Sequence, residues 1–387
     1  MGGKCAKSRL SIESIASVAS IESVESVGFA LFQIHLTPYD LRFTVWISDL
    51  GFVWNLVLGI WDLSPSNRNE LKKPIRIGVV GIGHLGKYHL QKYASIPGCR
   101  IAGAADIDIA RAREASAAYG CPPFSDHREL IGDVDAVSIA VPTESHFAIA
   151  RDFLKAGVDI LLEKPIAATM KEAGELVRLA RLKKNVLQIG FVERFNPAIK
   201  ALEKVIGIPM FIESHRLHPF FTRGTDVDVI LDLMIHDLDI ILHFVKSPIK
   251  SVEAVGVSVL SDKADIANAR IVFASGCVAN VTASRITGKK LQKIRFFGME
   301  GYHSVDYEKR ELVSLARKDG PAGRVEISPN TVQIEQCDPL EQEIRSFLRC
   351  VSERIPPLVT GEEAGRSLKL ALQIARKMRL NQERILS

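Results

Sequence analysis

The sequence predicts an α/β protein in which a doubly wound parallel sheet is followed by a second α/β domain with a large, open and mainly antiparallel sheet. Three observations predict this fold. Short β-rich segments alternate with helical ones from about residue 73, a glycine-rich turn joins the first of these strands to the first helix, and after Arg194 strand-like segments follow one another directly. Alternation produces parallel strands, whereas consecutive strands pair antiparallel and leave one face of their sheet open.

Composition limits the class of protein. The chain has 387 residues, of which 47% are hydrophobic and 25% charged, so it is long enough for two globular domains. Its formal charge of +5 comes without a cluster of Lys and Arg, which argues against a nucleic-acid partner. Six scattered cysteines without a C-x-x-C pair indicate reduced thiols in a cytoplasmic protein and no metal site.

Residues 1–72 differ from the rest of the chain. They include the low-complexity run SIESIASVASIESVESV and a stretch of 19 mostly apolar residues, from Phe43 to Trp61. A stretch of that length is long enough to span a membrane, but Asp49 interrupts it. We interpret residues 1–72 as an N-terminal extension outside the functional fold. A membrane-associated anchor and a structural arm are the alternatives.

The first functional domain, which we place at residues 73–192, alternates strands and helices. Runs of β-branched and apolar residues predict the strands, and amphipathic runs between them predict the helices. The strands are Ile75–Val80, Arg100–Ala105, Asp135–Val141, Asp159–Glu163 and Val186–Gly190, and the helices are His84–Ser95, Ile109–Tyr119, Ser145–Ala156 and Met170–Lys183. Right-handed crossovers then place helices on both faces of a parallel sheet.

The open sheet is expected in residues 193–338, which contain strand-like runs such as PMFIESHRL, SVEAVGVSVL, CVANVTASRI and KIRFFG. Residues 339–387 predict two amphipathic helices that pack back on the first domain. An open sheet would leave an apolar face in water. We therefore expect a homodimer or homotetramer in which a second copy of the chain covers that face.

The segment GVVGIGHLGKYHL predicts a dinucleotide-binding site. Gly81, Gly83 and Gly86 form G-x-G-x-x-G between a strand and a helix, and Asp106 follows 20 residues beyond Gly86. The glycines allow a tight turn, the close approach of a pyrophosphate and close helix packing, while the helix N-terminus supplies free N–H groups. This combination is typical of a Rossmann domain.

The acid after the second strand favours NAD as the cofactor. Asp106 would bond the ribose hydroxyls and repel a 2′-phosphate, and no Arg follows it directly. Arg111 and Arg113 lie one helical turn further along the chain. They keep NADP open as the alternative.

The segment DLMIHDLDIILHF, residues 232–244, carries acids and histidines within an apolar helix. At about 100° per residue, four polar side chains fall on one narrow stripe: Asp232, His236, Asp239 and His243. A solvated face would be broader and would mix Lys, Glu and Arg, so the stripe predicts a mostly buried helix that lines a cavity. We assign Asp239 and His243 structural roles and interpret Asp237, which lies off the stripe, as an ordinary polar neighbour.

Four motifs occur in order: the glycine turn, VPTESH (Val141–His146), EKP (Glu163–Pro165) and DLMIHDLD. With them the chain resembles the Gfo/Idh/MocA oxidoreductases from about Lys73 to about Arg379. The resemblance implies an NAD-dependent dehydrogenase that acts on a CH–OH group of a sugar, with a catalytic set of Lys164, Asp232 and His236. It also implies the following cofactor contacts: Gly81, Ile82, Gly83, Leu85, Gly86, Asp106, Val141, Pro142, Thr143, His146, Glu163 and Lys164.

Two further segments, GFVERFNP (Gly190–Pro197) and the run from Glu213 to Ile240, look like the UDP-N-acetylglucosamine 3-dehydrogenases of lipid A biosynthesis within that family. There DVDVIL replaces the usual Gly-Gly pair of the family. The resemblance implies oxidation at C3 of UDP-N-acetylglucosamine to a 3-keto nucleotide sugar, which a pathway aminotransferase uses. It implies these substrate contacts: Arg194, Asn196, Arg216, His218 and Arg223. Asn196 could instead only cap a helix.

The expected chemistry is proton removal as the hydride leaves. His236 is the predicted general base because imidazole titrates near neutral pH. Asp232, one turn earlier, would hold its ring, and Lys164 would stabilise the developing alkoxide unless it is only a surface lysine. An inositol or polyol dehydrogenase, an NAD-dependent glycoside hydrolase and a non-catalytic NAD sensor are the alternative functions.

Overall fold

The computed structural model describes residues 74–220, 228–319 and 325–386, together with four strands nearer the N-terminus. The chain divides into two compact units, Met1–Glu70 and Leu71–Ser387. In the first unit, β1 (Ile21–Glu22), β2 (Ala30–Leu36), β3 (Asp40–Ile47) and β4 (Phe52–Gly59) pair antiparallel in the order β1-β2-β3-β4. Most of the low-complexity run lies outside the described residues.

The apolar stretch considered above as a membrane anchor contributes to two strands in the structure. β3 and β4 pair from Asp40 with Gly59 to Ile47 with Phe52, so the chain reverses within residues 43–61. Across the described ranges, the helices are all too short or too polar to cross a bilayer.

The second unit begins with a six-stranded parallel sheet. Its strands are β5 (Ile75–Val80), β6 (Cys99–Ala105), β7 (Pro123–Phe124), β8 (Ala136–Ile139), β9 (Asp159–Glu163) and β10 (Leu187–Gly190), in the order β10-β9-β8-β5-β6-β7. Every residue of β8, β9 and β10 is buried, as expected for parallel strands covered on both faces. The predicted doubly wound sheet is confirmed. β7 was not predicted, because two residues carry no periodicity.

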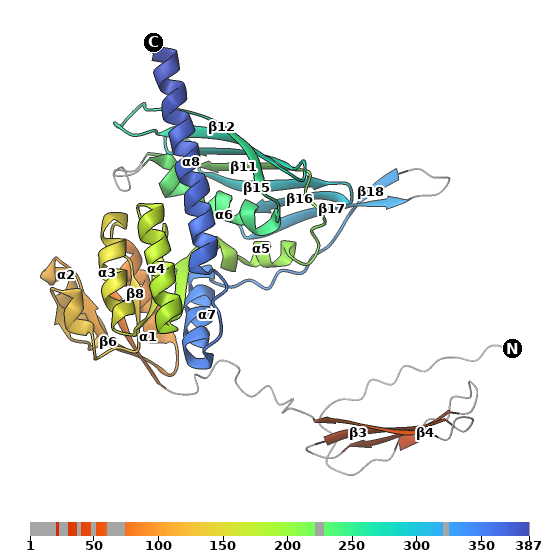
Figure 1. The fold of residues 1–387 in the computed structure, drawn as a ribbon. Helices are drawn as coiled ribbons and strands as arrows, with labels where there is room; N and C mark the ends of the chain where they lie inside the picture. The colour runs from red at the N-terminus through yellow and green to blue at the C-terminus, as the bar shows by residue number, and fades with distance from the viewer. Residues whose placement is uncertain are drawn as a thin grey trace. The chain divides into compact units, whose positions relative to one another are not determined.

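Helices α1 (His84–Ser95), α2 (Ile109–Tyr119), α3 (Thr143–Lys155) and α4 (Met170–Lys183) connect these strands (Figure 1). Local sequence explains where they begin and end. Thr169 and Glu172 form a capping box at the start of α4, and Asp108 caps α2 by accepting from the Ala110 amide. Gly120 ends α2 at φ 65°, a conformation that glycine adopts without strain.

The second sheet has eight strands and is mainly antiparallel. Its order is β12-β13-β14-β11-β15-β16-β17-β18, and only β11 and β14 pair in parallel. The strands are β11 (Phe211–Leu217), β12 (Ile249–Val257), β13 (Ile266–Phe273), β14 (Val278–Ser284), β15 (Leu291–Gly298), β16 (Gly301–Asp306), β17 (Glu311–Asp319) and β18 (Val325–Pro329). Burial alternates along β11 and β14, so one face packs on the core and the other is open, as predicted.

Helices cover the inner face of this sheet and join it to the first domain (Figure 1). They are η3 (Val192–Phe195), α5 (Pro197–Leu202), the π-helical η4 (Ile230–Met234), α6 (Ile235–Phe244), α7 (Pro339–Glu353) and α8 (Gly361–Leu386), whereas η2 (His127–Leu130) lies in the first domain between β7 and β8. α8 packs on β12, α6 and α4, and α7 packs on α1, β9 and η3. One buried cluster therefore runs from Leu162 through Ile235 to Ile294.

Candidate active site

A cavity of about 1190 Å³ lies between the two sheets of the second unit. Residues from both domains line it. The first domain contributes, among others, Gly81, Gly83, Leu85, Asp106, Val141 and Pro142, and the second contributes His218, Asp232, Leu233, Arg285 and Lys290. A cavity of this size at the carboxyl ends of parallel strands is the expected ligand position in a doubly wound sheet.

The glycine turn of this cavity is shaped by close packing. Gly81 has φ +87°, and a Cβ on it would lie 2.5 Å from the Ala140 carbonyl oxygen. A Cβ on Gly86 would lie 1.8 Å from the Gly81 carbonyl oxygen. Helix α1 can therefore pack this close to the turn only because residue 86 has no side chain. A Cβ on Gly83 would meet nothing within 4 Å. The backbone there is open to a ligand, and Gly83 begins α1 without a side-chain cap for the first amides.

Asp106 lies at the end of β6 and is almost fully buried at the edge of the cavity. Its carboxylate accepts from the backbone amides of Ile82 at 2.6 Å and of Asp108 at 2.9 Å. These bonds hold the acid in one orientation beside the turn. Arg111, the residue that keeps NADP open, lines the cavity but pairs with Asp108 at 3.3 Å.

His146 joins two loops beneath the cavity and does not line it. Its Nδ1 lies 2.8 Å from the Pro165 carbonyl oxygen and its Nε2 lies 2.9 Å from that of Val141. The ring thus connects the VPTESH loop to the EKP segment. Burial lowers the pKa of His146, which favours the neutral ring.

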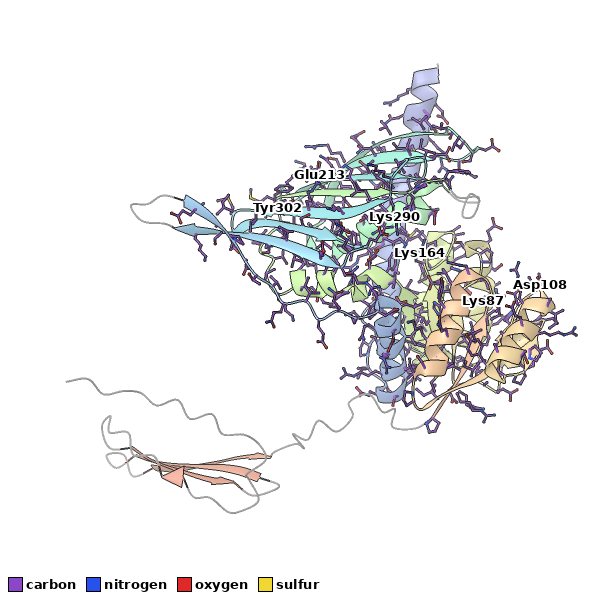
Figure 2. All side chains as sticks on the ribbon, turned by 180° about the vertical axis from the view of Figure 1, so that it is seen from behind. Lys87, Asp108, Lys164, Glu213, Lys290 and Tyr302 are labelled. Carbon is purple, nitrogen blue, oxygen red and sulfur yellow. The ribbon has the colours of Figure 1, made fainter. Side chains whose placement is uncertain are left out.

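Lys164 and Asp232 meet, although 68 residues separate them. The Lys164 ammonium donates to the Asp232 carbonyl oxygen at 2.7 Å, and its Nζ lies 3.7 Å from Asp232 Oδ1. Asp232 lies in the π-helical turn η4 and lines the cavity. Single π-turns occur frequently at functional sites because they redirect side chains. Figure 2 labels Lys164 and Lys290 where the eight-stranded sheet meets the first domain.

His236 follows directly after this turn and packs edge-on against Phe191, with ring centroids 6.1 Å apart. Its Nδ1 is buried and has no hydrogen-bond partner among the described residues. Burial, and then the charges of Lys164 and Arg216, hold the pKa of His236 well below its usual value. The ring is therefore neutral at pH 7 and able to accept a proton.

The expected contact between Asp232 and the His236 ring is not supported by these positions. Asp232 turns toward Lys164, and no bond joins it to His236 among the described residues. The reason is the π-turn. Our prediction stacked residues four apart on an α-helix, and a turn with i→i+5 bonds changes that register.

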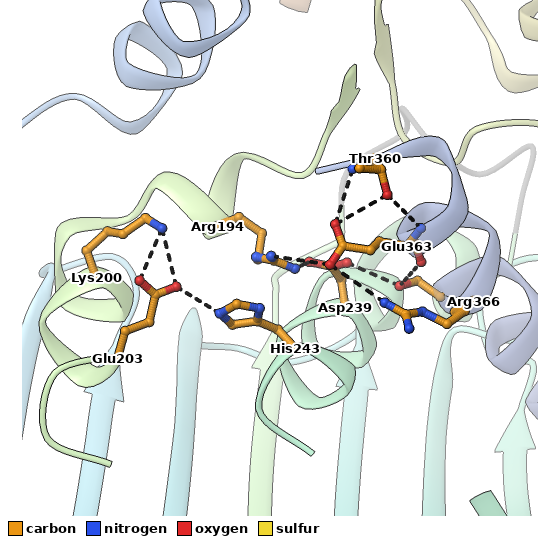
Figure 3. A network of polar contacts seen from close by, with 9 residues as sticks. Arg194, Lys200, Glu203, Asp239, His243, Thr360, Glu363 and Arg366 are labelled. Carbon is orange, nitrogen blue, oxygen red and sulfur yellow. Dashed lines mark hydrogen bonds and ion pairs between the residues drawn. The ribbon is translucent and has the colours of Figure 1, made fainter. Parts of the chain in front are cut away.

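Three residues predicted to face the substrate lie instead in the packed interior. Arg194 pairs with Asp239 at 3.4 Å and with Glu363 at 3.8 Å, in a network that joins η3, α6 and α8 (Figure 3). Asn196 caps α5 by accepting from the Ala198 amide, and it donates to the Tyr307 carbonyl oxygen. The positions of both residues support packing rather than substrate binding, because neither lines the cavity that the described residues form.

Arg216 is the third of these residues. It pairs with Asp237 at 2.7 Å and Glu193 at 3.1 Å, and its guanidinium lies 4.7 Å from the centroid of the Tyr307 ring. Asp237 is fully buried and also accepts from Ser214, so its interpretation as an ordinary polar neighbour was wrong. An unpaired buried charge is strongly destabilising, so buried charges are normally paired. Here Arg216 neutralises Asp237 and Glu193, and they neutralise it.

The remaining predicted residues divide between the cavity, the core and the undescribed part of the chain. His218 lines the cavity, and its Nε2 accepts from the Gln292 side-chain amide at 2.5 Å. Burial, and then the charges of Lys290 and Arg216, lower its pKa. Six further predicted residues are not among those that line the cavity: Ile82, Gly86, Thr143, Glu163, Lys164 and His236. Of these, Lys164 bonds to the lining residue Asp232. Arg223 lies outside the described residues.

Comparison with known proteins places this architecture in a family. Residues 75–191 match the NAD-binding Rossmann-fold model of the Gfo/Idh/MocA oxidoreductases, and residues 203–304 match the C-terminal domain model of the same family. The chain is 39% identical over 302 residues to the UDP-N-acetylglucosamine 3-dehydrogenase of Acidithiobacillus ferrooxidans, covering 78% of this chain and 96% of that protein. This chain is a Gfo/Idh/MocA oxidoreductase.

Further comparisons agree with this assignment. A solved structure of the Acidithiobacillus ferrooxidans enzyme matches with a TM-score of 0.73 at 38% identity, covering 79% of this chain and 97% of that one. The myo-inositol 2-dehydrogenase of Thermotoga maritima is 26% identical over 331 residues, covering 80% of this chain and 97% of that protein. A levoglucosan dehydrogenase solved with NADH and L-sorbose is 21% identical, with a TM-score of 0.71 over 79% of this chain and 97% of that one, and so shows the shared fold.

The matched model of residues 75–191 is that of an NAD-binding Rossmann fold, so the cofactor of this Gfo/Idh/MocA protein is NAD. Its residues fit that group: Gly83 leaves the backbone open to a pyrophosphate, the first amides of α1 have no side-chain cap, and Asp106 is held beside the turn. Among the described residues, no group of three or more His, Cys, Asp or Glu side chains is arranged to hold a metal ion.

Lys290 and Arg285 line the cavity, and our sequence reasoning missed them. They lie 46 and 51 residues beyond Asp239, the end of the DLMIHDLD motif, in the connection between β14 and β15. Because β14 and β15 both pair with β11, this connection comes to lie beside His218, at the end of β11. Thr287 also donates to the His218 carbonyl oxygen. Only the GKK run was visible in the sequence, and two lysines after a glycine are common in surface turns.

Proposed function

We propose that this protein oxidises the C3 hydroxyl of UDP-N-acetylglucosamine with NAD and releases a 3-keto nucleotide sugar. The observation that supports this proposal most strongly is the 39% identity to a UDP-N-acetylglucosamine 3-dehydrogenase across 96% of the length of that enzyme. The meeting of Lys164 with Asp232 at the cavity, with His236 following in the same segment, supports a dehydrogenase over a sensor. A sensor would not need these groups.

In this proposal His236 accepts the hydroxyl proton. Its neutral ring and its unpartnered buried Nδ1 support that role. The Lys164 ammonium stabilises the oxygen as it becomes negative, and Asp232 orients that ammonium through its carbonyl and carboxylate oxygens. NAD, when bound, accepts the hydride.

The rim of the cavity supports an anionic substrate. Lys290 extends from the β14–β15 connection and pairs with Glu308 at 3.1 Å, with both side chains about half exposed. Arg285 is neutralised by the buried Asp265 at 2.9 Å, so Lys290 has the more available charge. We assign the diphosphate of the nucleotide sugar to Lys290, with His218 beside it. An uncharged polyol would not need this lysine.

We propose the four-part division into residues 1–72, 73–192, 193–338 and 339–387, with the first part outside the catalytic fold. We also propose a cytoplasmic homodimer or homotetramer joined through the open sheet. An apolar row crosses five strands of that face: Val278, Phe211, Phe297, Tyr302 and Leu315. Glu213 and Arg295 form an ion pair in the next row at 2.7 Å, and Figure 2 labels Glu213 and Tyr302 on the sheet. A pathway aminotransferase, in lipid A biosynthesis, would consume the keto product.

A panel of substrates tests the function. Purified protein is mixed with NAD and with UDP-N-acetylglucosamine, myo-inositol or an aryl glycoside, and nicotinamide absorbance is followed. We expect NADH only with the nucleotide sugar. NADH from myo-inositol would favour the inositol dehydrogenases, to one of which the chain is 26% identical. Glycoside cleavage without net NADH would favour a hydrolase, and no turnover with any substrate would favour a sensor.

A further inference from the structure

A fully buried carboxyl group lies behind the cofactor site and belongs to the C-terminal part of the chain. Glu343 in α7 has no exposed surface, and neither of its side-chain oxygens has a hydrogen-bond partner among the described residues. α7 packs against α1 and β9, the strand that ends in Glu163 and leads into Lys164. A buried carboxyl without partners requires an explanation, because native proteins rarely leave such groups unsatisfied.

The surroundings of Glu343 form a polar network inside an apolar layer. Glu163 Oε1 lies 3.1 Å from His89 Nε2, and His89 Nδ1 lies 2.8 Å from the Ser138 hydroxyl. Tyr93 shares that hydroxyl at 3.0 Å. All of these side chains are buried, and they connect α1 to β8 and β9.

Gln188 of β10 adds a third acceptor oxygen without a donor to the two of Glu343. Its side-chain amide donates to the backbone carbonyl of Glu343 at 3.0 Å, and its Oε1 is buried with no partner among the described residues. Glu343 and Gln188 thus hold three buried acceptor oxygens without a donor. A single proton on Glu343 would convert one acceptor into a donor and relieve this shortage.

Electrostatics point the same way. Burial, and then the charge of Glu163, raise the pKa of Glu343 well above its usual value. The titratable groups that act on Glu343 are Glu163 from β9 and Tyr93 from α1, and His89 of α1 bonds to Glu163. On η3, Glu193 and Arg194 are already paired with Arg216 and Asp239. The charge that acts on Glu343 is thus negative, and together with burial it favours the protonated carboxyl.

We propose that Glu343 is a positioning residue: its protonated carboxyl donates toward Glu163 and so holds the Glu163–Lys164 segment beside the cavity. The inference rests on the proposed function and gives helix α7 a supporting role behind the cavity. Glu163 is confined on its other side by Gly190, where a Cβ would lie 3.1 Å from the Glu163 carboxyl. Glu163 shares a peptide bond with Lys164, so a shift of its side chain would also move the lysine that meets Asp232.

Three variants of the full-length protein test this proposal. Glu343→Gln keeps the shape and supplies a donor that does not titrate, Glu343→Leu keeps most of the volume without a donor, and Glu341→Gln is the matched control. Glu341 lies two residues earlier on α7, is partly exposed and pairs with Arg345. The measurements are kcat and KM for UDP-N-acetylglucosamine from pH 6 to pH 10, the Kd of NADH by fluorescence, and the melting temperature.

We expect E343Q and E341Q to stay within about twofold of wild type in kcat and NADH Kd at pH 7. We expect E343L to lose at least about tenfold in kcat. Wild type and E341Q should share an alkaline loss of activity, as Glu343 gives up its proton, and E343Q should lack that loss. E343L with unchanged kcat and pH profile, or E343Q with the wild-type alkaline loss, would overturn the proposal.

Two further measures keep the test decisive. If E343L does not fold, the pH profile of E343Q still decides. If wild type shows no turnover with UDP-N-acetylglucosamine, the proposed function fails by itself. The Kd of NADH, measured against pH for wild type and E343Q, then tests the inference separately, because Glu163 lies at the end of β9 beside the cofactor site. Equal pH dependence of the two would contradict it.

Discussion

His236 is held neutral by its position. Its ring is largely enclosed, lies near two cations and has one nitrogen without a partner among the described residues. A base of this kind must be unprotonated to act, so the low pKa extends its working range downward. We expect kcat/KM to stay level from pH 8 to about pH 6 and to fall only in stronger acid. A pH profile with a midpoint near 7 would contradict this.

Removing the proposed base should affect turnover more than cofactor binding. We expect His236→Ala and Lys164→Ala each to lower kcat by roughly 10²- to 10⁴-fold, the usual range for a positioned proton acceptor or donor. The Kd of NADH should stay within about threefold in the His236 variant, because His236 is not among the cofactor contacts that the resemblance implies. Stopped-flow absorbance gives the first quantity and fluorescence titration the second. A matched loss in both would indicate misfolding.

We expect Lys290 to favour a nucleotide sugar over an uncharged polyol. We expect Lys290→Met to raise KM for UDP-N-acetylglucosamine by about tenfold, the lower range for a hydrogen bond to a charged group because the lysine is partly exposed. Lys290→Arg should recover most of it. The KM for NAD is the internal reference, and Lys309→Met on a neighbouring turn is the control. An unchanged KM for the sugar in K290M would remove Lys290 from the substrate site.

At the scale of the elements, the network in Figure 3 joins η3, α6 and α8. Arg194 is a buried cation that forms ion pairs with both Asp239 and Glu363. Helix α8 therefore attaches to the catalytic helix through a charge pair as well as through apolar contacts. Breaking one partner of such a pair leaves the other charge buried and unpaired.

We expect Arg194→Met to lower the free energy of unfolding by about 3–5 kcal/mol, and the double variant R194M/D239L to recover much of it. Burial already raises the pKa of Asp239, so without Arg194 this acid should take up a proton more readily. The loss in R194M should therefore be smaller at pH 5 than at pH 8. Urea unfolding at both values measures it. A pH-independent loss would exclude the role of Asp239.

At the scale of the molecule, the open face of the eight-stranded sheet carries an aromatic row. Phe211, Phe297 and Tyr302 stack across three strands with centroids 5.5 and 5.0 Å apart. If this face joins two copies, Phe297→Glu should convert the oligomer into monomers while the NADH Kd stays unchanged, because a buried like-charge pair would form at the interface. Light scattering at micromolar concentration measures the mass. A wild-type monomer would refute the proposed assembly.

The sequence by itself determined the features that depend on neighbouring residues. The bounds of β5, β9, α1, α2 and α4 agree with prediction residue for residue, because hydrophobic period, caps and turn residues act locally. The glycine turn and Asp106 were recognised for the same reason. The open sheet was also predicted, although its last strands were not identified individually.

Only the tertiary structure decided which side chains face the cavity. Arg194 and Arg216 look like substrate contacts in the sequence, yet Asp239 and Asp237 neutralise them in the core. Lys290 reaches the cavity because β14 and β15 both pair with β11. Pairings between residues far apart in the chain leave no periodic signal. Burial, which decides whether a charge binds a ligand or another residue, is a property of the whole packed chain.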